Sequence, residues 1–314
     1  TMTVTSNDPQ DAKEILESAI RVYPDVARFV IGDTKFNMIN VPTVPTEPYN
    51  QPNYTRKVVK GALFGAAAGV FLIALYALFR KTVQTPDELK NVMNLTCMGN
   101  IPQIRSKARK KSKEQVLSIF NKDLSQRFKE NILSIELKAE REMDEKNGKI
   151  LLVTSTISGE GKSTLALNMA YAAAAHGKRV LFIDGDLRKQ IDRKKLTEKE
   201  GQGLFGVVKG KVSLEEAVET DPRSGIRFLC GNLPVRNVPG VLNHPVFKEI
   251  LEQARKENDL IILDAPPAEM FEDASLMAEY SDGILYVIRH DFVQKRRILD
   301  SLAGLEESSC PILG

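Results

Sequence analysis

Short apolar runs alternate with helical stretches along the second half of the chain. From Lys149 onward the apolar runs are KILLVTS, KRVLFID, IRFLC, LIILDAPP and GILYVIR, with helical segments such as STLALNMAYAAAAHG between them. Strands that are apolar along their whole length are typical of a parallel sheet covered by helices on both faces. With the charged amphipathic helix that we expect from Asp123 to Glu140, the pattern predicts a doubly wound α/β domain over residues 123–314.

The longest apolar run, GALFGAAAGVFLIALYALF, extends from Gly61 to Phe79 without a charged residue. About 20 apolar residues are enough to cross a bilayer core as a helix, so residues 58–80 are predicted to form a transmembrane helix. Basic residues continue beyond it from Arg105 to Lys113, which favours a cytoplasmic C-terminal side. The basic cluster from Arg56 to Lys60 partly opposes this orientation.

The segments on either side of this run have different patterns. In residues 1–57, TMTVTS alternates like a strand, Asp8 is expected to cap a helix that ends before Pro24, and a proline-rich stretch from Ile39 is typical of a stiff connector. Residues 81–122 are predicted to form a juxtamembrane linker that opens with a short helix capped by Thr85. Its basic residues either rest on anionic lipid or are solvated.

Composition and charge narrow the function classes. A chain of 314 residues, 42% apolar and 27% charged, can build one full core and a smaller unit, and a net charge of +3 is too weak to indicate nucleic acid. The three cysteines and three histidines are scattered without metal-ligand spacing. Neither a disulfide framework nor a zinc site is predicted.

The segment LVTSTISGEGKSTLALNMA has the strand, glycine-rich turn and helix that a phosphate-binding loop needs. Gly159 and Gly161 allow backbone N–H groups to approach phosphate oxygens, and the start of the following helix adds partial positive charge. Lys162 is then expected to reach the β and γ phosphates, and Ser163 to bind Mg²⁺. The usual first glycine of such a loop is replaced by Thr156.

Three aspartates follow two other apolar runs. Asp184 and Asp186 end VLFIDGD, and Asp264 ends LIILD. Ligands of open parallel sheets bind at the carboxyl ends of the strands, where the phosphate loop also lies. Carboxylates gathered beside phosphates repel one another unless a divalent cation lies between them, so this pattern predicts Mg²⁺.

The segments ISGEGKST, VLFIDGDLR and LIILDAPP together resemble the Walker A, Walker A′ and Walker B motifs of bacterial tyrosine kinases, the BY-kinases. The segment before the membrane run is similar to the end of a chain-length-determinant (Wzz-type) polysaccharide co-polymerase domain. VQTPDELKNVMNLTCMGNIPQI is similar to the stretch that follows the second membrane helix in those proteins. The resemblance covers nearly the whole chain in the expected order.

The resemblance implies roles for individual residues. Lys162, Asp184, Asp186 and Asp264 would be catalytic, with Asp184 accepting the tyrosine hydroxyl proton, and Ser163, Asp186 and Asp264 would hold Mg²⁺. The nucleotide would be bound by Ser158, Gly159, Glu160, Gly161, Lys162, Ser163, Thr164 and Arg188. For Arg188, stabilisation of transferred charge and a structural salt bridge are both open, and Asp273 and Asp282 are interpreted as helix-cap and loop residues.

The implied function is a membrane-anchored tyrosine autokinase that uses ATP and Mg²⁺ and regulates the chain length or export of capsular polysaccharide or exopolysaccharide. Expected partners are further copies of the chain, the polysaccharide polymerase and export machinery, and a cognate phosphotyrosine phosphatase, at a bacterial inner membrane. The alternative is a nucleotide-binding co-polymerase scaffold without kinase activity. A ParA-like ATPase is disfavoured because Thr156 replaces the signature lysine of that class.

Two departures from the family stand out. The seven tyrosines form no cluster, and the chain stops at SSCPILG, where the family begins its last core strand. The first membrane helix of the family is also missing, so a fragment cut at both ends is expected. The helix before the domain has Gln126, Lys129 and Ile132 where the family often has a Glu, Arg, Arg triplet that joins subunits into a ring. Ring assembly through that contact is therefore not predicted.

Overall fold

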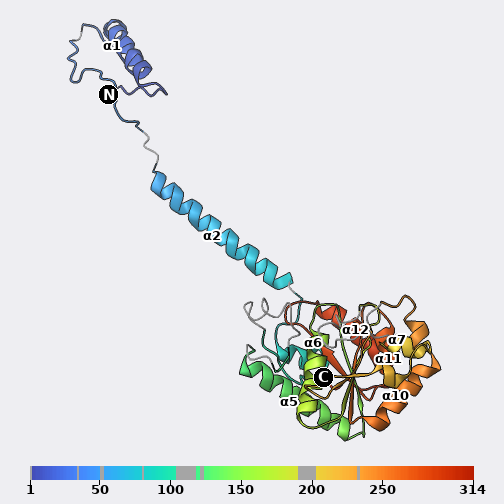
Figure 1. The fold of residues 1–314 in the computed structure, drawn as a ribbon. Coiled ribbons are helices and arrows are strands. Elements are labelled where there is room, and N and C mark those ends of the chain that lie inside the picture. The colour runs from blue at the N-terminus through green and yellow to red at the C-terminus, as the bar shows by residue number, and fades with distance from the viewer. Residues whose placement is uncertain are drawn as a thin grey trace. The chain divides into compact units, whose positions relative to one another are not determined.

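The structure is a computed structural model that describes residues 2–33, 35–49, 53–79, 81–103, 118–120, 124–189, 203–231 and 234–314. It divides into two compact units, Thr1–Phe79 and Arg80–Gly314 (Figure 1). The basic residues from Arg105 to Lys113 lie outside the described residues.

Helix α1 (Pro9–Ile31) begins as predicted, because the Asp8 carboxylate accepts a hydrogen bond from the backbone N–H of Gln10 at 2.8 Å. The predicted end before Pro24 is wrong, since α1 continues through this proline. Proline removes one N–H donor and crowds one carbonyl, but helical pairing resumes after it and the Gly32 N–H closes the last turn on the Arg28 carbonyl. The strand predicted in TMTVTS is also wrong: residues 2–6 are irregular, because a lone strand without a neighbour is unstable.

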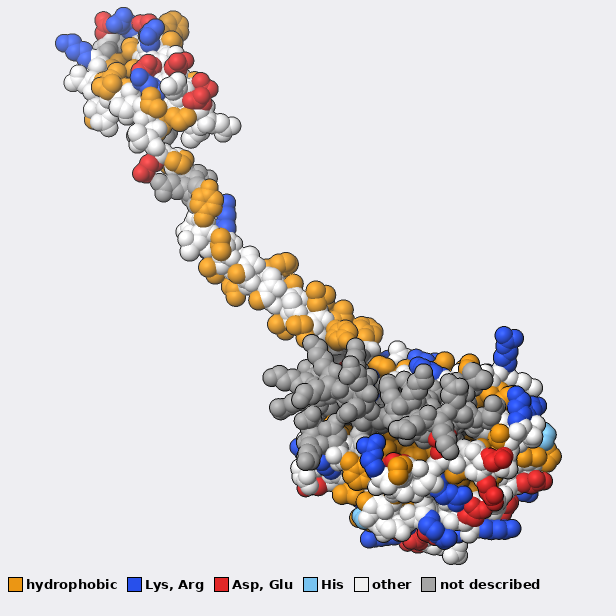
Figure 2. All heavy atoms as spheres, in the orientation of Figure 1, with side chains coloured by type: hydrophobic (Ala, Val, Ile, Leu, Met, Phe, Trp, Pro, Cys, Tyr) orange, Lys and Arg blue, Asp and Glu red, His pale blue; other side chains and the backbone are white. Residues whose placement is uncertain are grey.

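Helix α2 (Tyr54–Phe79) contains the apolar run. Among the described residues it supplies the one helix that is long and apolar enough to cross a membrane, Tyr54–Ala77, with a mean hydropathy of 2.1 and none of its most apolar window buried. Figure 2 shows hydrophobic side chains along its visible face.

The second unit contains a six-stranded sheet in the order β3-β4-β2-β5-β1-β6. The strands are β1 (Ile150–Ser155), β2 (Val180–Asp184), β3 (Glu219–Thr220), β4 (Arg227–Leu229), β5 (Leu260–Asp264) and β6 (Gly283–Val287). All neighbours pair in parallel except β3 with β4. The five apolar runs are therefore confirmed as strands of a mostly parallel sheet.

Helices cover both faces of this sheet, as the doubly wound prediction requires. They are α3 (Pro86–Met93), α5 (Gln126–Asp144), α6 (Lys162–Ala175), α7 (Gly203–Val208), α8 (Leu214–Ala217), α9 (Pro239–Leu242), α10 (Pro245–Glu257), α11 (Asp273–Ala278) and α12 (Lys295–Glu306). The alternating residues of β1 enter two different cores: Leu151 and Val153 pack with α5 and α6, whereas Ile150 and Leu152 pack with α10, α11 and α12.

Residues 81–103 belong to the second unit rather than to a separate linker, so the division predicted at residue 123 lies inside one compact unit. Val83 and Met98 are buried in the two cores. Backbone N–H groups of Asp291 and Lys295 donate to the carbonyls of Val83 and Lys81, both at 2.8 Å. The segment therefore packs directly onto the loop between β6 and α12.

Residues 311–314 pair with β6. Ile312 lies opposite Ile284 in a parallel bridge, and the Tyr286 N–H donates to the Gly314 carbonyl at 2.8 Å. The segment CPILG thus takes the place at which a further sheet strand was expected to start.

Candidate active site

The predicted motifs meet because the three strands that carry them are adjacent. β2, β5 and β1 are consecutive in the sheet, and Asp184 lies directly opposite Asp264 in the β2–β5 register. Val153 of β1 lies opposite the same aspartate. The carboxyl ends of these strands therefore bring both aspartate segments beside the loop between β1 and α6.

The loop after β1 turns sharply into α6. Gly159 and Gly161 have φ angles of 93° and 102°, a left-handed conformation that side chains with a Cβ rarely adopt. Thr156 is outside this region, so the first loop position needs no glycine here. Its buried hydroxyl instead forms a hydrogen bond with the Tyr286 hydroxyl at 2.9 Å.

Lys162, the first residue of α6, lies between two carboxylates. Its Nζ is 3.3 Å from Asp186 Oδ2, 3.3 Å from Asp264 Oδ1 and 3.2 Å from the Ser163 hydroxyl. Burial by itself would lower the pKa of Lys162, but the two aspartate charges and their hydrogen bonds outweigh it and raise that pKa. The lysine is therefore held as a buried cation.

Asp264 is fully buried, and its Oδ2 atom has no hydrogen-bond partner within the described residues. Burial raises the pKa of this carboxyl, although the charge of Lys162 and a hydrogen bond from Ser163 act in the opposite direction. Asp184 is also buried, and one of its oxygens accepts the Asp186 N–H at 3.2 Å. An unpaired carboxylate oxygen beside a hydroxyl and a second carboxylate is a donor set that fits Mg²⁺.

The remaining predicted phosphate-loop residues differ in what their side chains do. Ser158 is exposed and Thr164 is half-buried at the start of α6. The Glu160 carboxylate accepts hydrogen bonds from the backbone N–H groups of Ile157 at 2.7 Å and Arg289 at 3.3 Å. Its side chain is therefore engaged on protein groups, which leaves its backbone N–H for a phosphate.

Of the two interpretations of Arg188, the structure shows the salt bridge. Its guanidinium donates to both oxygens of the buried Asp273, at 2.7 and 3.1 Å, and lies 4.1 Å from the Phe271 ring centroid. The helix-cap interpretation of Asp273 is wrong, because Glu272 is the N-cap of α11 and Asp273 is its first residue, with both carboxylate oxygens held by Arg188. Asp282 is more than a loop residue, because it accepts the N–H groups of Lys149 and Ile150.

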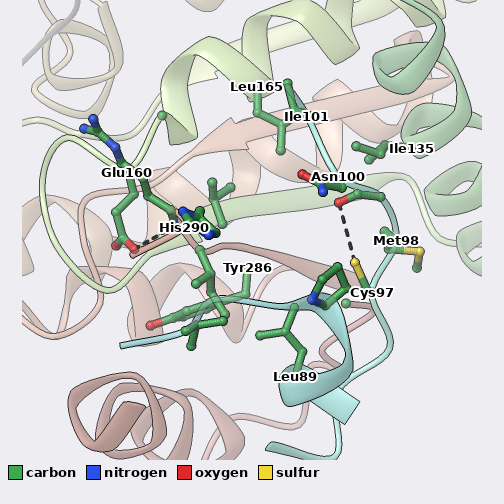
Figure 3. A pocket seen from close by; sticks show the side chains of 18 of the residues that line it. Leu89, Cys97, Met98, Asn100, Ile101, Ile135, Glu160, Leu165, Tyr286 and His290 are labelled. Atoms are coloured by element: carbon green, nitrogen blue, oxygen red, sulfur yellow. Dashed lines mark hydrogen bonds between the residues drawn. The ribbon is translucent and has the colours of Figure 1, made fainter. Parts of the chain in front are cut away.

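A pocket of about 750 Å³ adjoins the phosphate loop (Figure 3). The pocket is lined by parts of the segment 83–103, by one side of α5, by the phosphate loop with the start of α6, and by the end of β6 with the loop after it; the loop and α6 residues are Gly159, Glu160, Gly161, Thr164 and Leu165. Leu89, Ile101 and Ile135 supply apolar walls, and Asn100 and His290 supply polar groups. Sequence reasoning missed this pocket because no motif marks the segment 83–103 as part of a site.

Comparison with known proteins agrees with this geometry. Residues 148–295 match a family model described as an AAA domain. Over 166 residues the chain is 31% identical to the tyrosine-protein kinase YwqD of Bacillus subtilis. The aligned region covers 53% of this chain and 70% of YwqD. It is also 23% identical, over 89% of its length, to the succinoglycan biosynthesis transport protein ExoP of Rhizobium meliloti.

The chain spans 34–39% of the length of ExoP and of other long relatives that it matches. Among solved structures, the BceF tyrosine kinase domain superposes with a TM-score of 0.65 over 74% of this chain and the whole of that domain, at 23% identity. This likeness shows a shared fold, and the YwqD match shows the family. The chain belongs to the bacterial tyrosine-protein kinases.

Proposed function

We propose that this protein is a tyrosine kinase that transfers the γ-phosphoryl group of ATP to a tyrosine hydroxyl. Its acceptors would include tyrosines of the same protein, so that it acts as an autokinase. The observation that carries the proposal is the position of Lys162, which begins α6 directly after the phosphate loop and lies 3.3 Å from both Asp186 and Asp264. A cation and carboxylates at a helix N-terminus are what phosphoryl transfer requires, since it depends on positioning and charge neutralisation.

Each polar group at the loop has a task in this proposal. Lys162 and the loop N–H groups would bind phosphate oxygens, with the positive end of α6 behind them. Ser163, Asp186 and Asp264 would hold Mg²⁺, which supplies charge neutralisation of the phosphates when bound. Asp184 would accept the proton of the tyrosine hydroxyl, because it ends the strand next to the Asp264 strand.

The pocket beside the loop would take the nucleoside. It shares Gly159, Gly161 and Thr164 with the phosphate loop, and its volume of about 750 Å³ is in the range of small-molecule sites. Its apolar walls suit a planar base, and its few polar groups would orient it. Burial of the base would also exclude water from the phosphates.

The cellular role that fits best is regulation of polysaccharide chain length or export at a bacterial inner membrane. α2 would anchor the chain, with the second unit in the cytoplasm where ATP is available. The printed name of ExoP, a succinoglycan biosynthesis transport protein, supports an association with export machinery. Self-assembly and a phosphatase that resets the phosphotyrosines complete the proposal, with a Wzz-type extracytoplasmic segment before α2.

The test is incubation of the detergent-solubilised chain with Mg²⁺ and γ-labelled ATP, with and without a Glu–Tyr copolymer as acceptor. Phosphotyrosine scored by mass spectrometry is expected, and it should be lost in Lys162→Met and reduced at least a hundredfold in Asp184→Asn, on the order of a lost catalytic base. Circular dichroism would confirm that both variants fold. ATP binding without any phosphotyrosine would contradict the kinase and favour the nucleotide-binding scaffold.

A further inference from the structure

Glu160 occupies an unusual place for an acidic side chain, inside the phosphate loop and only 7% exposed. Its Oε2 accepts the Ile157 N–H of its own loop at 2.7 Å, and its Oε1 accepts the Arg289 N–H at 3.3 Å. One carboxylate thus joins the start of the phosphate loop to the loop after β6. In Figure 3 this side chain is directed toward the loop that carries His290.

The connection is reciprocal. The Arg289 guanidinium donates to the Gly159 carbonyl at 3.1 Å and lies 4.5 Å from the Phe292 ring centroid. Phe292 in turn lies near Gly159, where an added Cβ would come within 3.8 Å of its ring. We name these two hydrogen-bonded links, Glu160 to Arg289 and Arg289 to Gly159, the loop clasp.

We propose that Glu160 is a positioning residue for nucleotide binding: through the loop clasp it holds the phosphate loop in the conformation that presents its N–H groups to phosphate. This inference rests on the proposed nucleotide site. Both carboxylate oxygens are engaged on protein donors, and a bare carboxylate would repel phosphate, so Glu160 acts through the loop rather than on the ligand.

The physical basis is preorganisation. The loop contains two glycines with positive φ, and Ser158 and Gly159 are exposed, so burial does not hold this part of the loop in place. A loop that must be ordered when the ligand arrives loses part of the binding free energy to that ordering. Hydrogen bonds to an ionised, buried acceptor are stronger than neutral ones, so one carboxylate can fix the loop in advance.

The clasp also predicts a pH dependence. Burial raises the pKa of Glu160, against the opposing effect of its hydrogen bonds from the Ile157, Arg289 and Thr156 backbone and from Ser155. The charged groups around Glu160 are Arg289 and Arg297, and Arg297 is paired with Glu269. Tyr286 also lies nearby, but its pKa is raised to about 12, so it stays neutral between pH 6 and pH 8. Protonation of Glu160 as the pH falls weakens the acceptor and should loosen the loop.

The experiment compares the full chain with Glu160→Ala, Glu160→Gln and the control Glu252→Gln, an exposed glutamate of α10. Dissociation constants for Mg-ATP are measured at pH 8 and pH 6, with thermal unfolding of each protein without nucleotide. Glu160→Ala should bind ATP about tenfold to a hundredfold more weakly, the range for one lost hydrogen bond to a charged group. The ATP affinity of Glu160→Gln should lie between those of Glu160→Ala and the wild type, and the affinity of Glu252→Gln should match that of the wild type.

Wild-type affinity should also fall more steeply than that of Glu160→Gln between pH 8 and pH 6. A lower melting temperature with unchanged ATP affinity in Glu160→Ala would assign the residue a merely structural role and overturn the inference. The same pH profile for wild type and Glu160→Gln would overturn it as well. Failure of the wild type to bind ATP would defeat the proposed function itself, and the clasp with it.

Discussion

Lys162 is the residue on which the site depends electrostatically, because one buried cation serves two buried carboxylates. Asp186 and Asp264 each lie 3.3 Å from its Nζ, and Asp264 keeps one oxygen without a partner in the described structure. Removing charges from water costs free energy, and this cost is offset only when the buried charges are well paired. The site is therefore poised for a further cation, and it tolerates the loss of its lysine poorly.

Replacing Lys162 by methionine should lower the free energy of unfolding by about 3–5 kcal/mol near pH 8, the cost of leaving a partner charge buried and uncompensated. The loss should be smaller at pH 5.5. Asp264 already has a pKa raised by burial, and removal of the lysine raises it further. The folded state then binds a proton more tightly than the unfolded state, so stability falls as pH rises through that window. Urea denaturation at the two pH values measures it.

The double variant Lys162→Met with Asp264→Asn provides the control for this charge argument. Its neutral amide carries no buried charge, so most of the lost stability should return at pH 8. An equal loss for the single variant at both pH values would mean that packing, not charge, dominates at this position.

The site could be predicted from the sequence because each short motif directly follows a strand. The three strands β2, β5 and β1 are neighbours in the sheet, which brings their motifs together. The sequence did not predict the side-chain partners. Thr156 replaces a glycine without strain because its φ angle is not positive. Its hydroxyl shares a hydrogen bond with the Tyr286 hydroxyl, which is also hydrogen-bonded to the Ser301 hydroxyl in α12 at 2.8 Å. Those partners are 130 and 15 residues from Tyr286 along the chain, beyond the reach of any local pattern.

At the scale of elements, the segment 81–103 shows most clearly where pattern and packing diverge. Its polar, proline-containing sequence predicts a linker, yet Val83 and Met98 are 5% and 6% exposed in the domain core. An element this short gains its order from tertiary contacts rather than from propensity. The two-residue strand β3 was missed for the same reason, since its order comes from pairing with β4.

The variant Met98→Ala should lower the free energy of unfolding by about 2–4 kcal/mol, as expected when a buried side chain is truncated in a core. The exposed variant Asp87→Ala in α3 is the matched control and should change it by no more than about 0.5 kcal/mol. Chemical denaturation of the second unit measures both. Equal stability of the two variants would show that the segment 81–103 is not part of the cooperative fold.

At the scale of the whole molecule, one chain joins two units whose surfaces differ in polarity. The second unit has a buried parallel sheet with helices on both faces, whereas α2 exposes apolar side chains along its length. Contiguous exposed apolar surface of this kind marks a site of membrane or protein interaction. A catalytic unit linked to such a helix is expected to act at a surface rather than freely in solution.

The chain produced in a bacterium should therefore sediment with membranes, resist extraction by carbonate and dissolve in detergent. Deleting residues 54–79 should release the second unit into the supernatant with its ATP binding intact. Ala66→Arg combined with Gly69→Arg should weaken insertion, since each arginine at the centre of a span costs about 2.5–3.5 kcal/mol on the insertion scale. The matched pair Ala66→Leu and Gly69→Leu should insert normally, which separates charge from bulk. If the deleted form still sedimented and resisted carbonate, another part of the chain would be the anchor, and α2 would instead be a helix that awaits a protein partner.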